Sequence, residues 1–229
     1  MTDQEIVAGG GEIAQASGTL GLNVYSDWEF ISVLQTFYSF SGTGQGSGAV
    51  AWLSGDFTGS GIAEIAQLWD NHGHLGLNVY RMGETPQTVI SSSDLGQGSG
   101  AVAWLTGDFT GSGHTEIARL WDNNGTLGAV IYGCVNGTAE TLFGSSDLGQ
   151  GSGAVAWLTG TFTSSGIDEI VQLWDNNGTL SYLHYGYSNG SLTTLWFGGD
   201  LGQGPGALAW LTGNFTGSGY AAIAQLWAS

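Results

Sequence analysis

The residues best suited to chemistry in this chain are tryptophans followed directly by aspartate and asparagine. Trp-Asp-Asn occurs at Trp69, Trp121 and Trp174, and each copy runs into a turn rich in asparagine and glycine. An indole offers an apolar face to the C–H side of a sugar ring, and carboxylates and amides bind hydroxyl groups. These residue types therefore fit the binding of a neutral ligand.

Residues for catalysis are harder to find. Hydrolysis needs a nucleophile beside a base, or two carboxylates facing each other in a cleft. Of the four histidines only His72 and His74 lie near each other, on an expected hairpin tip, and none accompanies a recognisable nucleophile motif. We therefore expect a protein that is not an enzyme and that has no cofactor.

Composition excludes further classes. The 229 residues include 42 glycines but only two prolines, and two arginines against 19 acidic residues give a formal net charge of −17. Each interior glycine would cost a helix roughly 1 kcal/mol, so turn-rich β-structure is expected. Nucleic-acid binding needs a basic surface and is excluded, as is binding to an anionic membrane. The single cysteine, Cys134, reads as an apolar filler.

One block of sixteen residues recurs four times along the chain. The second copy, GSGAVAWLTGDFTGSG, has an apolar run followed by two glycine-containing turns. The copies are spaced by 52, 53 and 53 residues, which is typical of propeller blades when the composition is that of β-structure. They begin near residues 46, 98, 151 and 204.

Each period divides into four strands if apolar runs are strands and Gly, Asn, Asp and Ser mark turns. Asn124 and Asn136, each followed by glycine, stand where hairpin turns need a positive φ. We predict one all-β domain over residues 1–229, a β-propeller with four-stranded antiparallel blades and four blades per chain. In one period the strands are expected at residues 101–109, 115–122, 126–132 and 139–143.

The two ends of the chain predict how the ring closes. The sequence stops just after a second strand, whereas residues 16–25 read as a third strand and residues 30–40 as a fourth. One blade shared between the ends would then close the ring, and blades pooled in an oligomeric ring are the alternative. GEIAQ at residues 11–15 reads as an additional strand, so residues 1–17 are expected to add an edge strand or to be flexible.

The segments GDFTGSGIAEIAQLW (55–69) and GDFTGSGHTEIARLW (107–121) resemble FG-GAP and VCBS repeats. With the tryptophan-rich strands and the following Asp-Asn turns, the chain from about Gly18 onward is most similar to the PLL-type bacterial β-propeller lectins. The resemblance implies a propeller that binds sugars. Those relatives typically have seven blades, so the expected four are a departure and their pocket geometry is not carried over.

Many FG-GAP repeats bind calcium, but the residues of this chain argue against it. The corresponding positions in the first copy are Asp56, Thr58 and Ser60, and later copies replace the aspartate by Thr161 and Asn214. Calcium needs six to eight oxygen ligands, several of them carboxylate. We expect these segments to be structural turns without a metal.

Strand order brings the Asp-Asn hairpins and the connections between blades, with their sequence DLGQGSG, to one face of the propeller. We predict that neutral sugars bind there. A tryptophan within AVAWL, such as Trp157, is expected to serve packing alone, whereas the tryptophan before Asp-Asn is split between packing and ligand stacking. The candidate ligand-binding residues are Trp69, Asp70, Asn71, Asp94, Gln97, Trp121, Asp122, Asn123, Asp147, Gln150, Trp174, Asp175, Asn176, Asp200, Gln203 and Trp227.

The leading functional hypothesis is a multivalent lectin whose partners are glycans, meaning neutral monosaccharides or their methylated forms. A non-catalytic protein-interaction scaffold and a consensus-like repeat protein without a ligand remain open as alternatives. We expect a soluble chain without a signal peptide, without membrane insertion and without nucleic-acid binding, and a homo-oligomer is possible.

Overall fold

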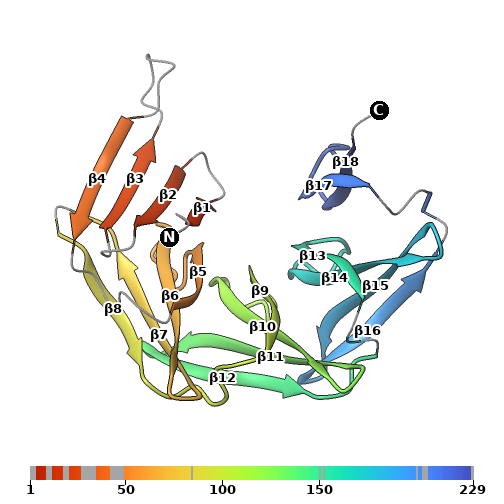
Figure 1. The fold of residues 1–229 in the computed structure, drawn as a ribbon, viewed down its shortest axis with the longest axis horizontal. Coiled ribbons are helices and arrows are strands. Elements are labelled where there is room, and N and C mark those ends of the chain that lie inside the picture. Colours follow the sequence, from red (N-terminus) through yellow and green to blue (C-terminus); the bar gives the residue numbers. More distant parts are fainter. Residues whose placement is uncertain are drawn as a thin grey trace. The chain divides into compact units, whose positions relative to one another are not determined.

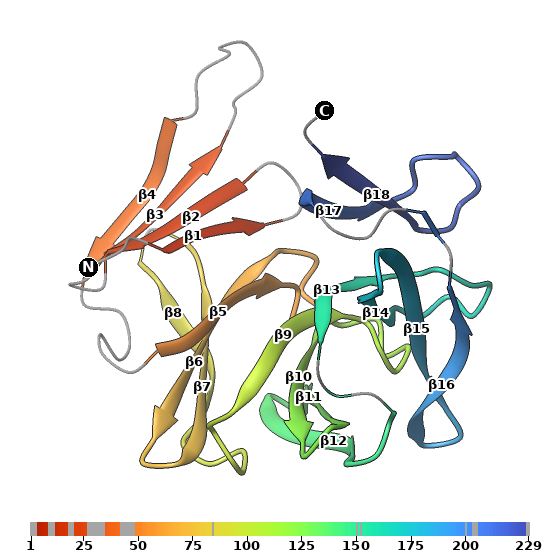
Figure 2. The ribbon, with the colours of Figure 1, turned by 45° about the vertical axis from the view of Figure 1, so that its right-hand side comes forward.

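A computed structural model describes residues 4–8, 12–17, 21–26, 35–41, 49–83, 85–149, 151, 153–199, 201–202 and 206–227, the first four ranges by their backbone only. In this part of the chain all regular structure is β-strand, and no helix is long and apolar enough to cross a membrane. The all-β prediction is confirmed. Figures 1 and 2 show the strands gathered into separate sheets in chain order.

Four of these sheets have four antiparallel strands each, and a fifth has two. The first sheet contains β1 (Gln4–Ala8), β2 (Glu12–Ser17), β3 (Gly21–Ser26) and β4 (Gln35–Ser41). The second contains β5 (Ala49–Gly55), β6 (Glu64–Asn71), β7 (His74–Arg81) and β8 (Gln87–Ser92). The third contains β9 (Ala101–Gly107), β10 (Glu116–Asn123), β11 (Thr126–Val135) and β12 (Thr138–Ser145). The fourth contains β13 (Ala154–Gly160), β14 (Glu169–Asn176), β15 (Thr179–Ser188) and β16 (Ser191–Gly198), and the fifth β17 (Ala207–Gly213) and β18 (Ala222–Trp227).

The turn chemistry read from the sequence is confirmed at the hairpins. Asn124 and Asn136 have φ of 54° and 53°, the left-handed conformation that their hairpins need. His72, which replaces asparagine in the second sheet, takes φ of 55° in the same role. Each sheet therefore forms by local pairing of strands that are neighbours in sequence.

The chain divides into two compact units. One comprises residues 1–99 and 134–140, and the other residues 100–133 and 141–229. In the first unit β1 lies beside β5, and in the second β13 lies beside both β9 and β17. Within each unit, then, the first strands of successive sheets are neighbours, as in propeller blades. The single domain expected from the sequence stays a prediction.

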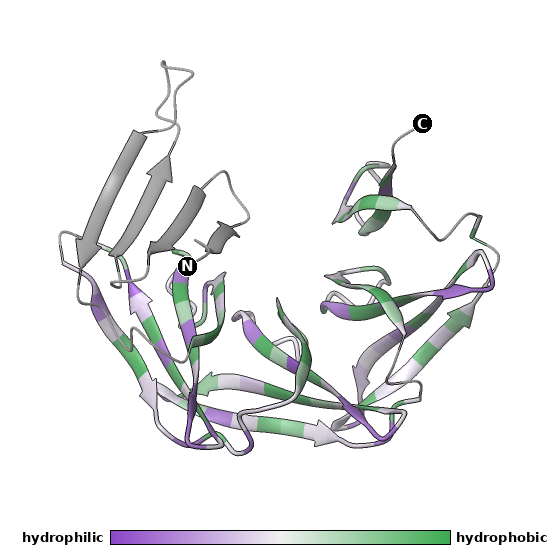
Figure 3. Cartoon of the chain, viewed as in Figure 1, coloured by the Kyte–Doolittle hydropathy of each residue, from purple (hydrophilic) through white to green (hydrophobic). Residues whose placement is uncertain are grey.

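Successive sheets of the second unit pack face to face. We call the face that carries the last tryptophan of the second strand, such as Trp121 or Trp174, the tryptophan face, and the opposite one the leucine face. Leu120, on the leucine face of the third sheet, is fully buried in a core that also contains Ile170 and Tyr185 from the tryptophan face of the fourth. Figure 3 shows hydrophobic residues distributed along the strands from β5 to β18.

The prediction that one blade is shared between the two ends of the chain is wrong: the described residues form four four-stranded sheets and a separate two-stranded one. β3 pairs with β2 and β4, which completes a sheet of its own. The reason is local: residues 4–17 supply two strands next to β3, so little loop entropy is lost when they pair. Sequence analysis missed β1 because QEIVA lacks the AVAWL pattern. A closed ring is not part of what the structure shows.

Candidate functional site: the hairpins, their connections and a pocket between sheets

The aspartate of each Trp-Asp-Asn motif holds its own hairpin. The carboxylate oxygen Oδ1 of Asp122 accepts the amide of Gly125 at 2.6 Å, and Asp70 and Asp175 accept the corresponding glycine amides at 2.6 Å and 2.7 Å. This turn-capping role explains why the aspartate recurs.

In the second, third and fourth sheets the connection that follows the sheet folds back against that sheet's hairpin, as the sequence predicted. Gly98 donates its amide to the carbonyl of Gly73 at 3.0 Å, and Gly151 does the same to Gly125 at 3.0 Å. The asparagine of the motif fastens the same contact, because Nδ2 of Asn123 donates to the carbonyl of Ser146 at 3.0 Å. Asn71 donates to the carbonyl of Ser93 at 2.9 Å in the same way.

Asp94 and Gln97 also reach the hairpin of the second sheet. Oδ1 of Asp94 lies 3.0 Å from Nδ1 of His74, and Gln97 forms an antiparallel bridge with His74. The pKa of Asp94 is lowered, first by the amide of Gly96 and then by His74. Asp147 is exposed in the connection after β12, and Asn176 is exposed at the end of β14. Gln150, Asp200 and Gln203 lie outside the described residues, as does the side chain of Trp227.

The tryptophan of the motif lies flat over the strand beside it. Trp69 pairs with Gly76 and Trp121 with Gly128, and a Cβ atom on either glycine would come within 2.1 Å of the indole. Trp174 instead faces a serine. All three indoles are half-buried. The guanidinium of Arg119 covers part of the Trp121 ring, with its Cζ 5.0 Å from the ring centroid. Packing thus accounts for one face of these rings.

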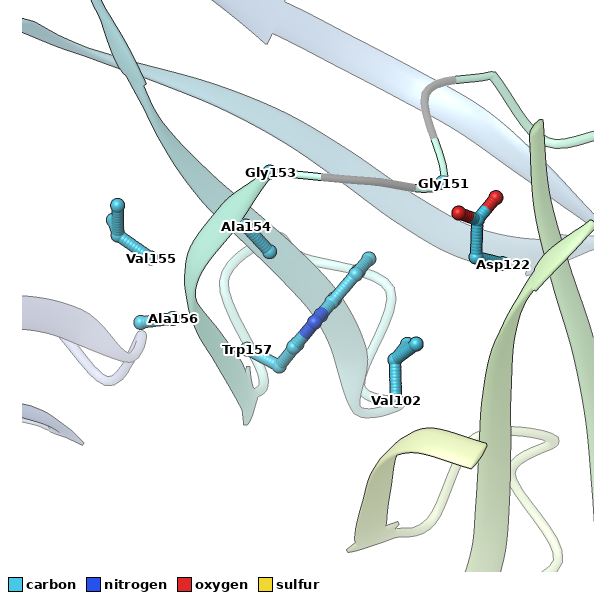
Figure 4. A pocket seen from close by; sticks show the side chains of 8 residues that line it. All are labelled: Val102, Asp122, Gly151, Gly153, Ala154, Val155, Ala156 and Trp157. Carbon is cyan, nitrogen blue, oxygen red and sulfur yellow. The ribbon is translucent and has the colours of Figure 1, made fainter. Parts of the chain in front are cut away.

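A pocket of about 350 Å³ opens in the second unit between the third and fourth sheets. Figure 4 shows the indole of Trp157 projecting toward the space between Val102, Ala154 and the carboxylate of Asp122. Val102 and Val155 expose 47% and 43% of their surface, so the walls are apolar and open to solvent. The residues that line the pocket are Val102, Asp122, Gly151, Gly153, Ala154, Val155, Ala156 and Trp157.

Among the predicted site residues that the structure describes, only Asp122 lines this pocket, and the indole that borders it belongs to a different tryptophan, Trp157. Trp121 packs on its own sheet, and Asn123 binds the connection. Trp157 was expected to serve packing alone, yet it both packs against the core and borders the pocket. The sequence does contain a signal for this role of Trp157. The residue lies only three positions after Ala154, where the glycine-rich connection ends and the strand begins.

The repeat places the same residue types at the junction between the fourth sheet and β17–β18, also within the second unit. Trp210 takes the position of Trp157 and packs against Leu173 and Leu180. Asp175, Val155 and Leu208 take the positions of Asp122, Val102 and Val155. The residue types that lie at the first junction are therefore repeated at the second.

The buried acids at the other end of the second strands serve structure. Glu64, Glu116 and Glu169 are at most 1% exposed, and each accepts the amide and hydroxyl of a threonine in the Gly-Asp-Phe turn or, for Glu169, in its Gly-Thr-Phe counterpart. Arg81 donates to Glu64 at 2.7 Å. Burial raises the pKa of Glu116, although the threonine and serine of its turn oppose this.

The aspartates of the Gly-Asp-Phe turns accept amides of their own turns. Asp56 accepts the amides of Ser60 and Gly61, both at 2.7 Å, and Asp108 accepts that of Gly113 at 2.9 Å. Among the described residues, His, Cys, Asp and Glu form no group of three that could hold a metal ion. The turn interpretation made from the sequence accounts for these contacts.

Comparison with known proteins gives a likeness of fold. No family model and no curated protein matches the chain. Among solved structures, the exotype rhamnogalacturonan lyase YesX is similar over 97% of this chain, with a TM-score of 0.52 and 15% identity. The rhamnogalacturonan lyase PL11 of Bacillus licheniformis is similar over 96%, with a TM-score of 0.50 and 15% identity. This chain spans 42% and 57% of those two chains.

These neighbours overturn the prediction that the chain is not an enzyme. That prediction rested on the absence of familiar catalytic motifs, yet both neighbours named above are lyases with a similar fold. A motif search is blind to sites assembled from residues far apart in sequence. At 15% identity the likeness establishes the fold and assigns no reaction to this chain.

Proposed function

We propose that the sheets are blades of a β-propeller and that the protein binds neutral carbohydrates in crevices between successive blades, as PLL-type lectins do. The pocket between the third and fourth sheets carries this proposal. Its volume of about 350 Å³ lies in the usual range of ligand sites, roughly 300–1,000 Å³. It combines one indole, aliphatic walls and a single carboxylate.

The chemistry of that lining matches one sugar ring. The indole of Trp157 and the side chain of Val102 supply the surface on which the C–H face of a pyranose packs. Oδ1 of Asp122 is engaged by Gly125, so Oδ2 is the oxygen that accepts a hydroxyl. The repetition of these residue types at the next junction supports more than one site per chain, and therefore avidity for multivalent glycans.

Charge supports neutral over acidic ligands. The chain carries a formal net charge of −17, and the ionisable side chain in the pocket is an acid. A uronate bound there would be repelled, because a carboxylate about 4 Å from another costs on the order of 1 kcal/mol in water and more where water is excluded. The names of the fold neighbours, which concern rhamnogalacturonan, support a carbohydrate ligand in general.

Isothermal titration calorimetry with neutral monosaccharides, their methyl derivatives and rhamnogalacturonan tests the proposal. Asp122→Asn keeps an oxygen for the hairpin cap and removes the charge, and Val102→Phe fills the pocket without emptying the core. We expect each to weaken binding at this site about 10-fold or more. Trp196→Ala is the matched control, because Trp196 is 63% exposed and does not line the pocket.

Two results would count against the proposal. The first is no heat and no glycan-array signal with any neutral sugar at millimolar concentration. The second is binding that Val102→Phe leaves intact, which would place the site elsewhere. Tighter binding of acidic rhamnogalacturonan than of neutral sugars would overturn the charge argument while retaining carbohydrate binding.

A further inference from the structure

Four hairpin tips of this chain carry asparagine followed by glycine, a pair in which asparagine is chemically labile. The pairs begin at Asn124, Asn136, Asn177 and Asn189, and all four asparagines are exposed. In such a pair the amide nitrogen of the glycine attacks Cγ of the asparagine. The N–Cγ bond forms, the Cγ–Nδ2 bond breaks, and ammonia leaves with the amide proton. Water then opens the resulting succinimide to aspartate or isoaspartate.

The backbone does not distinguish the four tips. Their asparagines have φ between 52° and 54°, and glycine follows each of them. In an unfolded chain the following residue is the main influence on the rate of this reaction, so the four pairs would react alike there. What differs between the folded tips is the side chain two residues before the asparagine.

At two tips this side chain is a carboxylate that accepts the glycine amide. Oδ1 of Asp122 accepts the amide of Gly125 at 2.6 Å, and Oδ1 of Asp175 accepts that of Gly178 at 2.7 Å. The glycine nitrogen must lose its proton to attack, and a charge-assisted hydrogen bond holds that proton in place. The negative charge close by also disfavours the amide anion. The aspartate therefore protects the asparagine that it caps.

The other two tips lack a carboxylate at this position. Cys134 stands there in the third sheet: burial raises the pKa of its thiol, and a hydrogen bond from the backbone of Gly137 opposes this. Sulfur is a weak acceptor. In the fourth sheet the position holds Tyr187, whose ring stacks on Phe143 with the centroids 4.8 Å apart. The tyrosine side chain is thus engaged in packing and supplies no charged acceptor for the amide of Gly190.

We propose that Asn189 is a site of spontaneous succinimide formation in the folded protein. Asn136 reacts more slowly, and Asn124 and Asn177 are protected by their aspartate caps. A modified tip gains a negative charge and, as isoaspartate, an additional methylene in its backbone. The aspartate of the Trp-Asp-Asn motif therefore preserves its hairpin chemically as well as structurally. The proposal is independent of carbohydrate binding.

Peptide mapping by mass spectrometry, during incubation of the whole folded chain in mildly alkaline buffer, tests the proposal. The conversion of amide to acid at each tip, with isoaspartate counted separately, gives all the rates in one sample. We expect Asn189 to react about 10-fold or more faster than Asn177, which is the effect of one hydrogen bond to a charged group. In urea, where the hairpins are unfolded, we expect the rates to converge.

Two variants change the cap and leave the asparagine in place. Asp175→Ala should raise the rate at Asn177 about 10-fold. Asn124, whose cap is intact in that variant, is the control within the same molecule. Cys134→Asp should lower the rate at Asn136 toward that of Asn124. Circular dichroism shows that each variant keeps its β-structure, and if Asp175→Ala does not fold, Cys134→Asp decides the question by itself.

Three results would overturn the proposal. The first is a faster reaction at the folded Asn124 or Asn177 than at Asn189, because the carboxylate would then act as a base toward the glycine amide. The second is a rate that does not respond to the change of cap in either variant. The third is the same order of rates in urea as in the folded chain, which would assign that order to sequence and not to the caps.

Discussion

At the scale of single residues, His184 stands out because it breaks the repeat inside a core. The equivalent positions hold Val79 and Ile131, which are 1% and 0% exposed, and His184 itself is 6% exposed. Its Nε2 lies 3.3 Å from Oε2 of Glu169 but makes no aligned hydrogen bond there. Burial lowers the pKa of His184, and the nearby carboxylate of Glu169 opposes this.

The lowered pKa predicts a loss of stability in mild acid. As pH falls through about 6.5 the unfolded chain takes up a proton that the folded chain does not, so the free energy of unfolding decreases. His184→Ile restores the residue of the neighbouring repeat. We expect it to add about 1 kcal/mol at neutral pH, by removing a poorly bonded buried nitrogen, and to flatten the pH dependence.

Urea unfolding between pH 5 and pH 8 measures both effects. His114→Gln is the control, because His114 is half-exposed on a turn and should change stability by no more than about 0.5 kcal/mol. A variant at residue 184 that keeps the parent's slope in mild acid would show that another group is responsible.

The candidate site was predictable in its location more than in its residues. Composition and repeat pointed to the hairpins and connections, and Asp122 indeed lines the pocket there. For Trp121, which the sequence split between packing and ligand stacking, the packing of one face follows from its glycine partner, which lets the ring lie flat on the sheet and which only the register reveals. Trp157 was assigned to packing alone because a residue that packs in the core was assumed not to line a pocket. An indole has two faces and an edge, so Trp157 can do both.

At the scale of elements, each sheet depends on the clamp between a hairpin and the connection that follows it. In the third sheet the clamp has three parts: the cap by Asp122, the side chain of Asn123, and the backbone bonds from Gly151 to Gly125 and from Leu127 to Gly149. The second sheet repeats all three parts, and the fourth repeats the aspartate cap and the backbone bond from Leu180 to Gly202, which explains why this polar segment recurs. In the proposed function, Asp122 of this clamp also binds the ligand.

Two substitutions of one residue separate the cap from the charge. Asp122→Ala removes the acceptor for Gly125 and should lower the free energy of unfolding by about 1 kcal/mol, whereas Asp122→Asn should cost less because its amide oxygen still accepts. Chemical denaturation of both variants measures the difference. Equal losses would mean that charge, and not the cap, makes this residue important to the fold.

The strands were predictable because their signals are local. The four predicted strands of one period lie within about two or three residues of β9, β10, β11 and β12 at each end, which is the usual error for sequence-based boundaries. β1 was not found because its five residues resemble no other first strand. Which sheet β3 joins was decided by pairing partners, and pairing is a property of the folded chain that propensity does not encode.

At the scale of the whole molecule, the dominant feature is an uncompensated negative charge. The chain has nineteen acidic residues and two arginines. One of the arginines, Arg81, is paired with the buried Glu64 at 2.7 Å. Arg119 is 4% exposed and so contributes little at the surface. Almost all surface charge is therefore of one sign, and it repels itself in the compact state more than in the unfolded chain.

This balance predicts that salt stabilises the fold. Raising ionic strength from about 0.01 M to 0.5 M shortens the Debye length from about 30 Å to under 10 Å, which removes most of the repulsion between exposed carboxylates. The unfolding temperature should rise with sodium chloride. Choline chloride should act equally, because the effect is screening and the cation need not be bound. Measuring at a concentration where the chain is a single copy keeps association out of the result. A rise with sodium alone would instead reveal a specific cation site among the acidic residues.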